Sequence, residues 1–132
     1  MARQRDDEAG EQGGEADLCD DAGHDHAGVV AEVFAALVDD ATYARASELF
    51  GAFADPNRLK ILDALRTSAE LCVSDLMGVT QMTQSAVSHA LKLLRRRRLV
   101  EKRREGRHVY YRLHDDHVVK LVEFALDHLA EE

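Results

Sequence analysis

Two pairs of potential metal ligands lie near the carboxyl end of the chain. Asp115 and His117 form the first pair, and His128 and Glu131 follow eleven and fourteen residues after His117. Two imidazoles and two carboxylates suit a tetrahedral Zn²⁺ site, for which Co²⁺ is the expected substitute and soft thiophilic metals are poor ones. These residue types therefore indicate metal binding, provided that the fold brings the two pairs together.

The spacing determines how the pairs can meet. In a continuous helix, eleven residues return to within about 20° of the same face but roughly 16 Å further along the axis, so His117 and His128 of one chain cannot share an ion. If two copies pack antiparallel about a two-fold axis, the first pair of one copy meets the second pair of the other, and two equivalent sites result. The simpler interpretation is the polar face of an exposed amphipathic helix, which the spacing alone favours.

Length and composition limit the class of protein. The chain has 132 residues, enough for one domain, and 45% of them are hydrophobic. No apolar run approaches membrane-spanning length and residues 1–14 lack the hydrophobic segment of a signal peptide, so we expect a soluble, cytoplasmic protein without a membrane partner. Cys19 and Cys72 are too few for a disulfide framework, and in a reducing cytoplasm we expect thiols or metal ligands.

Charge is distributed unevenly along the chain. Residues 1–40 hold two basic and twelve acidic side chains, whereas residues 92–112 hold ten basic side chains against Glu101 and Glu105, a net charge of +8 within a chain of net charge -8. Such a basic stretch indicates a polyanionic partner. The alternative for the arginine run at 95–98 is a solvated helix end that favours the helix dipole.

Two regions follow from the patterns of composition and periodicity. Residues 1–27, rich in Asp, Glu, Gly and Ala, are predicted to be a flexible acidic arm, and residues 28–132 a folded domain. Apolar residues recur at helical spacing over 30–38 and 46–53, which predicts two amphipathic helices separated near Asp40. Asp55 and Pro56 then mark the N-cap and first residue of a third helix.

A helix-turn-helix is predicted over residues 74–99. Ser74 is the expected cap of a first helix through about Val79, and Thr83 the cap of a second that begins at Gln84. One face of the second helix is apolar. The opposite face carries hydroxyls, an imidazole and cations, which suits a helix that reads the major groove of DNA, although a solvent-exposed polar face is the alternative. The candidate DNA contacts on this helix are Gln84, Ser85, Ser88, His89, Lys92 and Arg96.

A β-hairpin is predicted directly after this helix. Residues 100–104 and 107–113 flank a two-residue turn at Glu105 and Gly106, and apolar and polar residues alternate in the second strand. The tip is basic, and its candidate DNA contacts are Arg103, Arg104 and Arg107. A basic hairpin after a reading helix is a wing that can touch phosphates or the minor groove.

Three ordered motifs then resemble the winged-helix core of the ArsR/SmtB family of metal-sensing repressors. They are ELCVSDL at residues 70–76, SAVSH at 85–89 and GRHVYY at 106–111, and the tail ALDHL at 125–129 is similar to the zinc-sensing SmtB branch. The similarity covers roughly residues 43–132. It implies a homodimer that binds an operator when metal-free and releases it on binding metal. It also implies a terminal-helix site made of Asp115 and His117 from one subunit with His128 and Glu131 from the other.

The same branch has a second kind of site, which this chain matches in part. Cys72 and Asp75 lie one turn apart where that site would be, and Cys19, His24 and His26 on the arm of the other subunit are its possible further ligands. The alternative is that Cys72 packs as a small hydrophobe and that Asp75 serves the helix N-terminus.

Two positions depart from the family pattern. Ser74 stands where arsenic- and cadmium-type members have a second cysteine, which argues against a purely thiolate site. Gln81 stands where related sequences commonly have glycine. Because a non-glycine residue in the left-handed conformation costs about 1 kcal/mol, we expect the turn to be built differently.

We therefore predict an α+β winged helix-turn-helix homodimer, mostly helical with one β-hairpin wing, that dimerises through its N- and C-terminal helices. The function expected is that of a zinc-responsive repressor of an inverted-repeat operator, with no enzymatic activity. In the terminal helix that carries the two ligand pairs, the apolar residues Val118, Leu121, Val122, Ala125 and Leu129 are expected to hold the dimer. The alternatives are a winged-helix regulator that senses another metal or redox state through Cys72 and Cys19, and a small hydrolytic metalloenzyme, which would need an open metal position.

Overall fold

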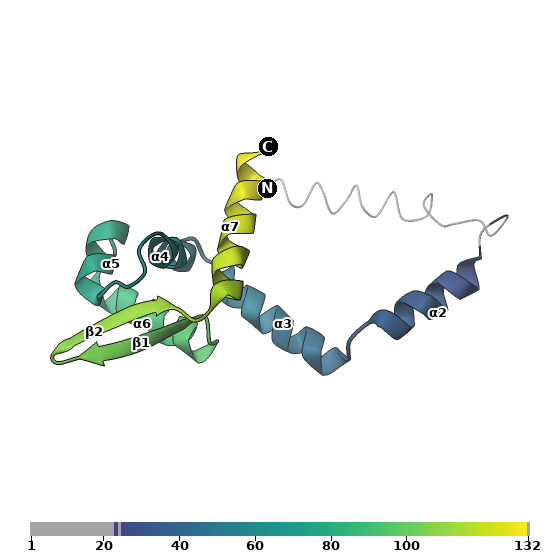
Figure 1. Ribbon diagram of the computed structural model, residues 1–132, viewed down its shortest axis with the longest axis horizontal. Helices are drawn as coiled ribbons and strands as arrows, with labels where there is room; N and C mark the ends of the chain where they lie inside the picture. Colours follow the sequence, from purple (N-terminus) through teal and green to yellow (C-terminus); the bar gives the residue numbers. More distant parts are fainter. Residues whose placement is uncertain (1–22, 24, 132) are drawn as a thin grey trace. The chain divides into compact units, whose positions relative to one another are not determined.

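The computed structural model describes residue 23 and residues 25–131 (Figure 1). These residues belong to two compact units, which divide between Asp39 and Asp40. One helix, α2 (His26–Ala36), belongs to the first unit. The second unit contains α3 (Asp40–Phe53), α4 (Pro56–Thr67), α5 (Val73–Thr80), α6 (Gln84–Arg96), β1 (Val100–Glu105), β2 (His108–Leu113) and α7 (Asp116–Ala130). This order confirms the predicted winged helix-turn-helix and the predicted break near Asp40.

Helix α2 is mostly apolar in sequence, and none of its residues is buried. Asp25 is its N-cap, and the Asp25 carboxylate accepts a hydrogen bond of 3.0 Å from the Gly28 N–H. Val30 and Phe34 are 53% and 76% exposed. Within its own unit, the described residues therefore leave these apolar side chains of α2 exposed.

The start of α4 is fixed by local chemistry, as predicted. The Asp55 carboxylate accepts a hydrogen bond of 2.9 Å from the Arg58 N–H, and Pro56 occupies the first turn, where a missing N–H costs nothing. The Arg58 guanidinium turns back and donates to the carbonyls of Ala52 and Gly51 at 2.8 and 3.1 Å. These bonds satisfy carbonyls at the end of α3 that have no partner within the helix.

One hydrophobic core holds the second unit together. Helices α4 to α7 and both strands contribute side chains to it, and α3 contributes Ala52. Its largest fully buried members are Ile61, Leu62, Leu76, Val87, Leu91, Leu94, Leu99 and Val122. Burial of each such side chain contributes about 1.5–3 kcal/mol, so the core fixes the faces that these elements turn outward.

Helix α5 begins after Cys72, not at Ser74, so the predicted cap was wrong. The Cys72 N–H donates to the Asp75 carboxylate at 3.1 Å, and Cys72 has the extended backbone of an N-cap residue. A carboxylate three residues into the helix that accepts from the N-cap N–H stabilises this start. Ser74 consequently lies inside the first turn.

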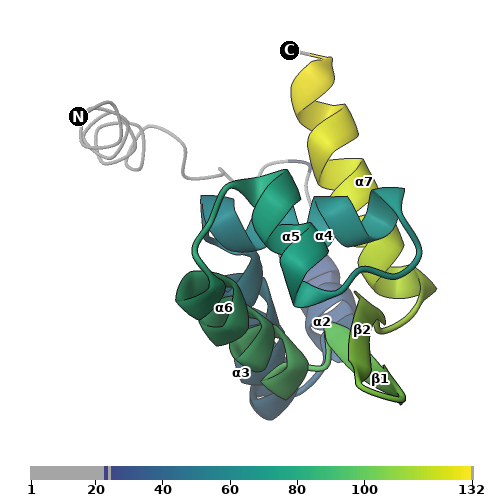
Figure 2. The same ribbon diagram turned by 90° about the vertical axis from the view of Figure 1, so that its left-hand side faces the viewer.

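The turn between α5 and α6 contains a left-handed residue after all. Gln81 has φ 63° and ψ 23°, so the expectation of a differently built turn was wrong. The Gln81 side chain donates to the Gly78 carbonyl at 2.7 Å and thereby offsets part of the backbone strain. The Thr83 hydroxyl then accepts from the Ala86 N–H at 3.1 Å, as predicted for the cap of α6. Figure 2 shows the two helices of the motif beside the hairpin.

The hairpin turn lies one residue later than predicted. Glu105 pairs with His108 at the end of the antiparallel ladder, so Gly106 and Arg107 are the central turn residues. Gly106 has φ 63°, and glycine at the first central position is typical of a type II′ turn, whose twist matches that of the strands.

No helix in the described part of the chain is long and apolar enough to cross a membrane.

Replacing Gln81 by glycine tests the strain in the turn. We predict that Gln81→Gly raises the free energy of unfolding by up to about 1 kcal/mol, because glycine adopts this conformation without steric cost. Gln84→Gly is the matched control: it makes the same change at the first residue of α6 and should not stabilise the protein. Urea denaturation at one protein concentration measures both. A Gln81→Gly protein less stable than the wild type would mean that the bond to Gly78 outweighs the strain.

Candidate nucleic-acid interface and metal-ligand clusters

Helix α6 presents one face to the core and the other to solvent. Val87, Ala90, Leu91 and Leu94 are between 0 and 6% exposed. The six predicted DNA contacts of this helix all lie on its exposed surface: Gln84, Ser85, Ser88, His89, Lys92 and Arg96. Short polar side chains thus precede cations along the exposed face, which allows base contacts at the N-terminal end and phosphate contacts beyond it.

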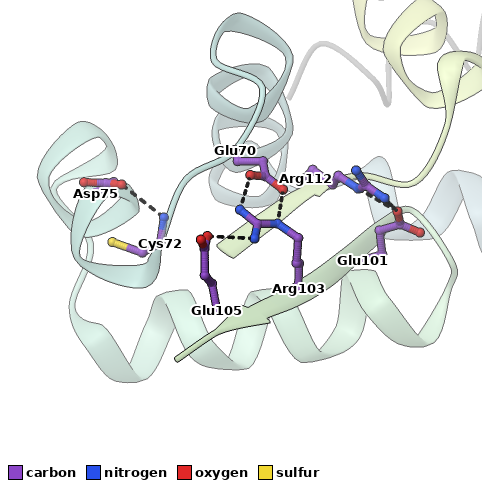
Figure 3. Close-up of polar contacts among 7 residues, drawn as sticks. All are labelled: Glu70, Cys72, Asp75, Glu101, Arg103, Glu105 and Arg112. Atoms are coloured by element: carbon purple, nitrogen blue, oxygen red, sulfur yellow. Dashed lines mark hydrogen bonds and ion pairs between the residues drawn. The ribbon is translucent and has the colours of Figure 1, made fainter. Parts of the chain in front are cut away.

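The hairpin carries the other predicted basic contacts, and they differ from one another. Arg104 and Arg107 are exposed, and neither has an ion-pair partner within residues 25–131. Arg103 is different, because carboxylates surround its guanidinium. Its Nη2 lies 2.7 Å from Oε1 of Glu70, and its Nη1 lies 2.9 Å from Oε1 of Glu105 (Figure 3).

Glu70 was not predicted as a functional residue. It precedes α5 by three residues and lies 33 positions before Arg103, a separation that no local pattern reveals. The hydrogen bond from Arg103 holds the pKa of the Glu70 carboxyl below its usual range, and the same contact raises the pKa of Arg103. Both groups therefore remain charged throughout the neutral range.

A second ion pair joins the two strands to each other. The Arg112 guanidinium donates to Glu101 at 2.7 Å, and these residues face one another in the strand register. Glu101 also lies 3.4 Å from Nδ1 of His114. This pair stabilises the hairpin internally, whereas the contact of Arg103 with Glu70 joins the hairpin to the segment before α5.

The first pair of potential metal ligands lies at the start of α7. Asp115 is the N-cap, and its Oδ1 accepts from the Val118 N–H at 3.2 Å. His117 Nδ1 lies 3.6 Å from the same Oδ1, and the imidazole is 92% exposed. Partial burial raises the pKa of Asp115, but the Val118 N–H and the nearby His117 outweigh it, so the net pKa is lowered. The carboxylate is therefore ionised, as a metal ligand must be.

The second pair lies at the opposite end of the same helix. His128 is in the last turn, Glu131 is the C-cap residue, and both are exposed. At 1.5 Å of rise per residue the two histidines are roughly 16 Å apart along the axis. The described residues of one chain bring no three potential ligands together. A site made of all four residues therefore needs a second chain.

Not all of the apolar residues of α7 that were predicted to hold a dimer are exposed. Val118 and Val122, expected to hold a dimer, are 4% and 1% exposed and belong to the core of their own chain. They lie one turn apart on the face that packs inward. Leu129 is 59% exposed and Phe124 is 67% exposed. The outward apolar surface thus lies in the second half of the helix.

A cavity of about 730 Å³ adjoins the first ligand pair. Residues from α3, from the end of α6 and from the start of α7 line it, Asp115 and His117 among them. Its walls also include the arginines at positions 45, 96, 97 and 98. The cavity leaves this end of α7 accessible from outside the chain.

The second candidate cluster is only partly within the described residues. Cys72 is a half-buried free thiol, and Asp75 accepts from its N–H, a hydrogen bond that lowers the pKa of the Asp75 carboxyl. Asp75 thus stabilises the N-terminus of α5, as in the alternative to a role as a metal ligand. Cys19 and His24 lie outside the described residues, and His26 is the first residue of α2 in the other unit.

A buried helix stripe with an exposed polar and cationic face, followed by a basic hairpin, defines a winged helix-turn-helix protein. The family model described as bacterial regulatory protein, arsR family, matches residues 55–102. The chain is 51% identical over 85 residues to the transcriptional repressor SmtB homolog of Synechocystis sp., an alignment that covers 64% of each chain. This protein belongs to the ArsR/SmtB family of transcriptional regulators, as the resemblance predicted.

Two further comparisons agree with this membership. The chain is 39% identical over 85 residues to the cadmium resistance transcriptional regulatory protein CadC homolog of Staphylococcus aureus, which covers 64% of this chain and 70% of that one. The solution structure of a homodimeric winged helix-turn-helix DNA-binding domain from Mycobacterium bovis is 30% identical, with a TM-score of 0.65. It covers 73% of this chain and 91% of that one.

Cobalt spectroscopy distinguishes the two ligand clusters. If Cys72 is a ligand, Co²⁺-loaded full-length protein shows thiolate-to-cobalt charge-transfer absorption, and Cys72→Ser removes it while leaving the oxygen and nitrogen cluster able to bind. His128→Ala is the control and should leave this absorption unchanged. Wild-type protein that binds Co²⁺ without any such band would make Cys72 a packing residue.

Proposed function

We propose that this protein is a zinc-responsive transcriptional repressor that binds operator DNA as a metal-free homodimer and releases it when metal binds between the terminal helices. The orientation of α6 carries the proposal, because its apolar stripe is buried and its hydroxyl, imidazole and cationic side chains are exposed. The exposed Arg104 and Arg107 on the following hairpin add phosphate-binding groups. Membership of a family of transcriptional regulators supports the same role.

Dimerisation is supported by apolar surface that the described residues of one chain leave exposed. On α7, Phe124 and Leu129 are more than half exposed, and on α2 the same holds for Val30 and Phe34. The solved Mycobacterium bovis relative is described as homodimeric. A two-fold dimer would present two reading helices to the same face of DNA, so the operator expected is an inverted repeat with half-sites about one helical turn apart.

The terminal helices supply the proposed metal site. Asp115 and His117 of one subunit would hold the ion together with the second pair, His128 and Glu131, of the other, a donor set that suits Zn²⁺. The 92% exposure of His117 fits a ligand site that is completed from another chain, since residues 25–131 of its own chain leave the imidazole uncovered. A bound ion would link the two terminal helices and restrain the dimer.

A second candidate is a regulator that senses another metal or redox state through Cys72 and Cys19. The half-buried thiol of Cys72 and the relative named for cadmium resistance favour it. The two candidates differ in which substitutions abolish the response. In the zinc-responsive repressor, the response requires His117. In the second candidate, it requires Cys72.

Salt dependence tests DNA binding. The metal-free dimer should bind an inverted-repeat duplex with an affinity that falls steeply with salt, and Arg107→Ala should reduce the slope of log affinity against log salt by about 1 per subunit. Ser88→Ala and His89→Ala should instead change sequence preference. Lys120→Ala, which removes a positive charge from α7, is the control and should leave both properties unchanged. Equal losses on every sequence for all four variants would contradict this assignment.

Zinc release tests the metal site. His117→Ala and His128→Ala should each dimerise and bind the operator, but zinc should no longer weaken their binding by the roughly 5–150-fold typical of such couplings. Fluorescence anisotropy of labelled operator during a zinc titration measures this. His114→Ala removes a neighbouring imidazole outside the ligand set and should remain zinc-responsive. A His117→Ala protein released at the wild-type zinc concentration would move the switch to Cys72.

Mixing the two variants tests whether the site is shared between subunits. A dimer of one His117→Ala chain and one His128→Ala chain contains one intact site and one doubly damaged site. After exchange of subunits, an equimolar mixture should therefore recover roughly one-quarter of wild-type zinc binding. Neither variant alone should show this zinc binding. No recovery would mean that the ligands do not come from two chains.

A further inference from the structure

We infer that Arg103 positions the wing on the DNA-binding domain through Glu70 and does not itself contact DNA. This inference rests on the proposed DNA-binding function and deepens it. It assigns a role to Glu70, which the sequence did not predict, and a different role to Arg103. The contact between these two residues is called the Glu70–Arg103 clamp below.

The clamp engages the whole guanidinium. Nη2 and Nε of Arg103 donate to the two carboxylate oxygens of Glu70 at 2.7 and 3.0 Å, and Nη1 donates to Glu105 at 2.9 Å. The guanidinium carbon also lies 5.1 Å from the centre of the Tyr110 ring. The two parallel bonds to Glu70 fix direction as well as distance, which an ammonium group would not do.

The clamp lies beside the backbone contact that attaches the hairpin to the same segment. The Leu71 N–H donates to the Tyr111 carbonyl at 3.0 Å, and the Tyr111 N–H donates back at 2.8 Å. This bridge and the buried Val100 and Leu113 hold the base of the hairpin. Glu70 precedes Leu71, and Arg103 is paired in register with Tyr110, which precedes Tyr111. The clamp is therefore a further attachment, one residue away on each side and one register position nearer the turn, and it restrains the part of the hairpin beyond the bridge.

Strand geometry separates this role from that of the neighbouring arginine. Successive residues of a strand point to opposite faces, so Arg103 and Arg104 face opposite sides of the hairpin. Arg104 is exposed and has no ion-pair partner among residues 25–131, whereas the negative charges of Glu70 and Glu105 beside the Arg103 guanidinium disfavour a phosphate there. The geometry thus leaves Arg104 and Arg107 for DNA and uses Arg103 to set their direction.

The direction in which one substitution changes the affinity for operator DNA tests the inference. Glu70→Gln removes a negative charge near the DNA-binding surface. If Glu70 only competed with DNA for Arg103, this change would tighten binding. If the clamp positions the wing, the change weakens operator binding, by about threefold to fivefold, as expected for loss of one exposed ion pair. Glu101→Gln is the matched control, because it makes the same change in charge but removes a pair within the hairpin.

Salt dependence and rescue separate positioning from direct contact. Arg103→Ala should weaken binding about as much as Glu70→Gln while leaving the salt slope unchanged, and the double variant should be no weaker than either. The charge-reversed pair Glu70→Arg with Arg103→Glu should recover part of the affinity. Arg107→Ala in the same assay reports whether DNA is bound as proposed. A Glu70→Gln protein that binds more tightly than Glu101→Gln, or a salt slope reduced by Arg103→Ala, would overturn the inference while leaving the proposed function intact.

Discussion

Burial of the apolar stripe of α6 is the constraint on which the other features depend. Val87 and Leu94 are both 0% exposed, and each contributes about 1.5–3 kcal/mol through burial. Helical periodicity then requires the hydroxyls, the imidazole and the cations to lie on the outside. Rotation of the helix by one residue position would expose the stripe and bury charge. The surface proposed to read DNA is therefore determined by the core beneath it.

The same constraint explains the strained residues at the two ends of α6. Gln81 precedes the helix and Arg98 follows it, and both have left-handed backbones without being glycine. After the helix, the Arg98 N–H bonds to the Arg95 carbonyl and the Leu99 N–H to the Leu94 carbonyl, as in a Schellman-type end. Each left-handed residue costs about 1 kcal/mol, less than the burial of Leu99 and of the stripe contributes. Burial of the core side chains therefore outweighs the preference of Gln81 and Arg98 for a right-handed or extended backbone.

Most of the fold could be predicted from the sequence because its signals are local. Each of these signals involves residues that are close together in the sequence. They are the helical spacing of apolar residues, the helix caps Asp55 and Thr83, and the alternation of apolar and polar residues in the second strand. The errors arose where a distant or competing partner decides. Asp75 moved the start of α5 from Ser74 to the residue after Cys72 by bonding to the Cys72 N–H.

The candidate site shows the same division. Exposure of the polar face of α6 follows from periodicity, but the partner of Arg103 does not, because Glu70 is 33 residues away and many pairings of opposite charges are compatible with the sequence. Periodicity also cannot tell whether an apolar face meets its own core or another chain. Val118 and Val122 show why, since they share a helix with the exposed Leu129.

Very few residues connect the start of α7, where the proposed metal ligands Asp115 and His117 lie, to the surface proposed to bind DNA. Leu113, the last residue of the hairpin, is buried, and the next residue, His114, donates its N–H to the carbonyl of Leu99, just beyond α6, at 2.9 Å. Asp115 follows directly and accepts from the N–H of the buried Val118. Restraint applied at Asp115 therefore acts on a backbone anchored to the core, to the hairpin and to the end of α6. A ligand held there need not displace any DNA-contacting side chain to alter the spacing of two reading helices in a dimer, because tightly packed elements transmit small shifts.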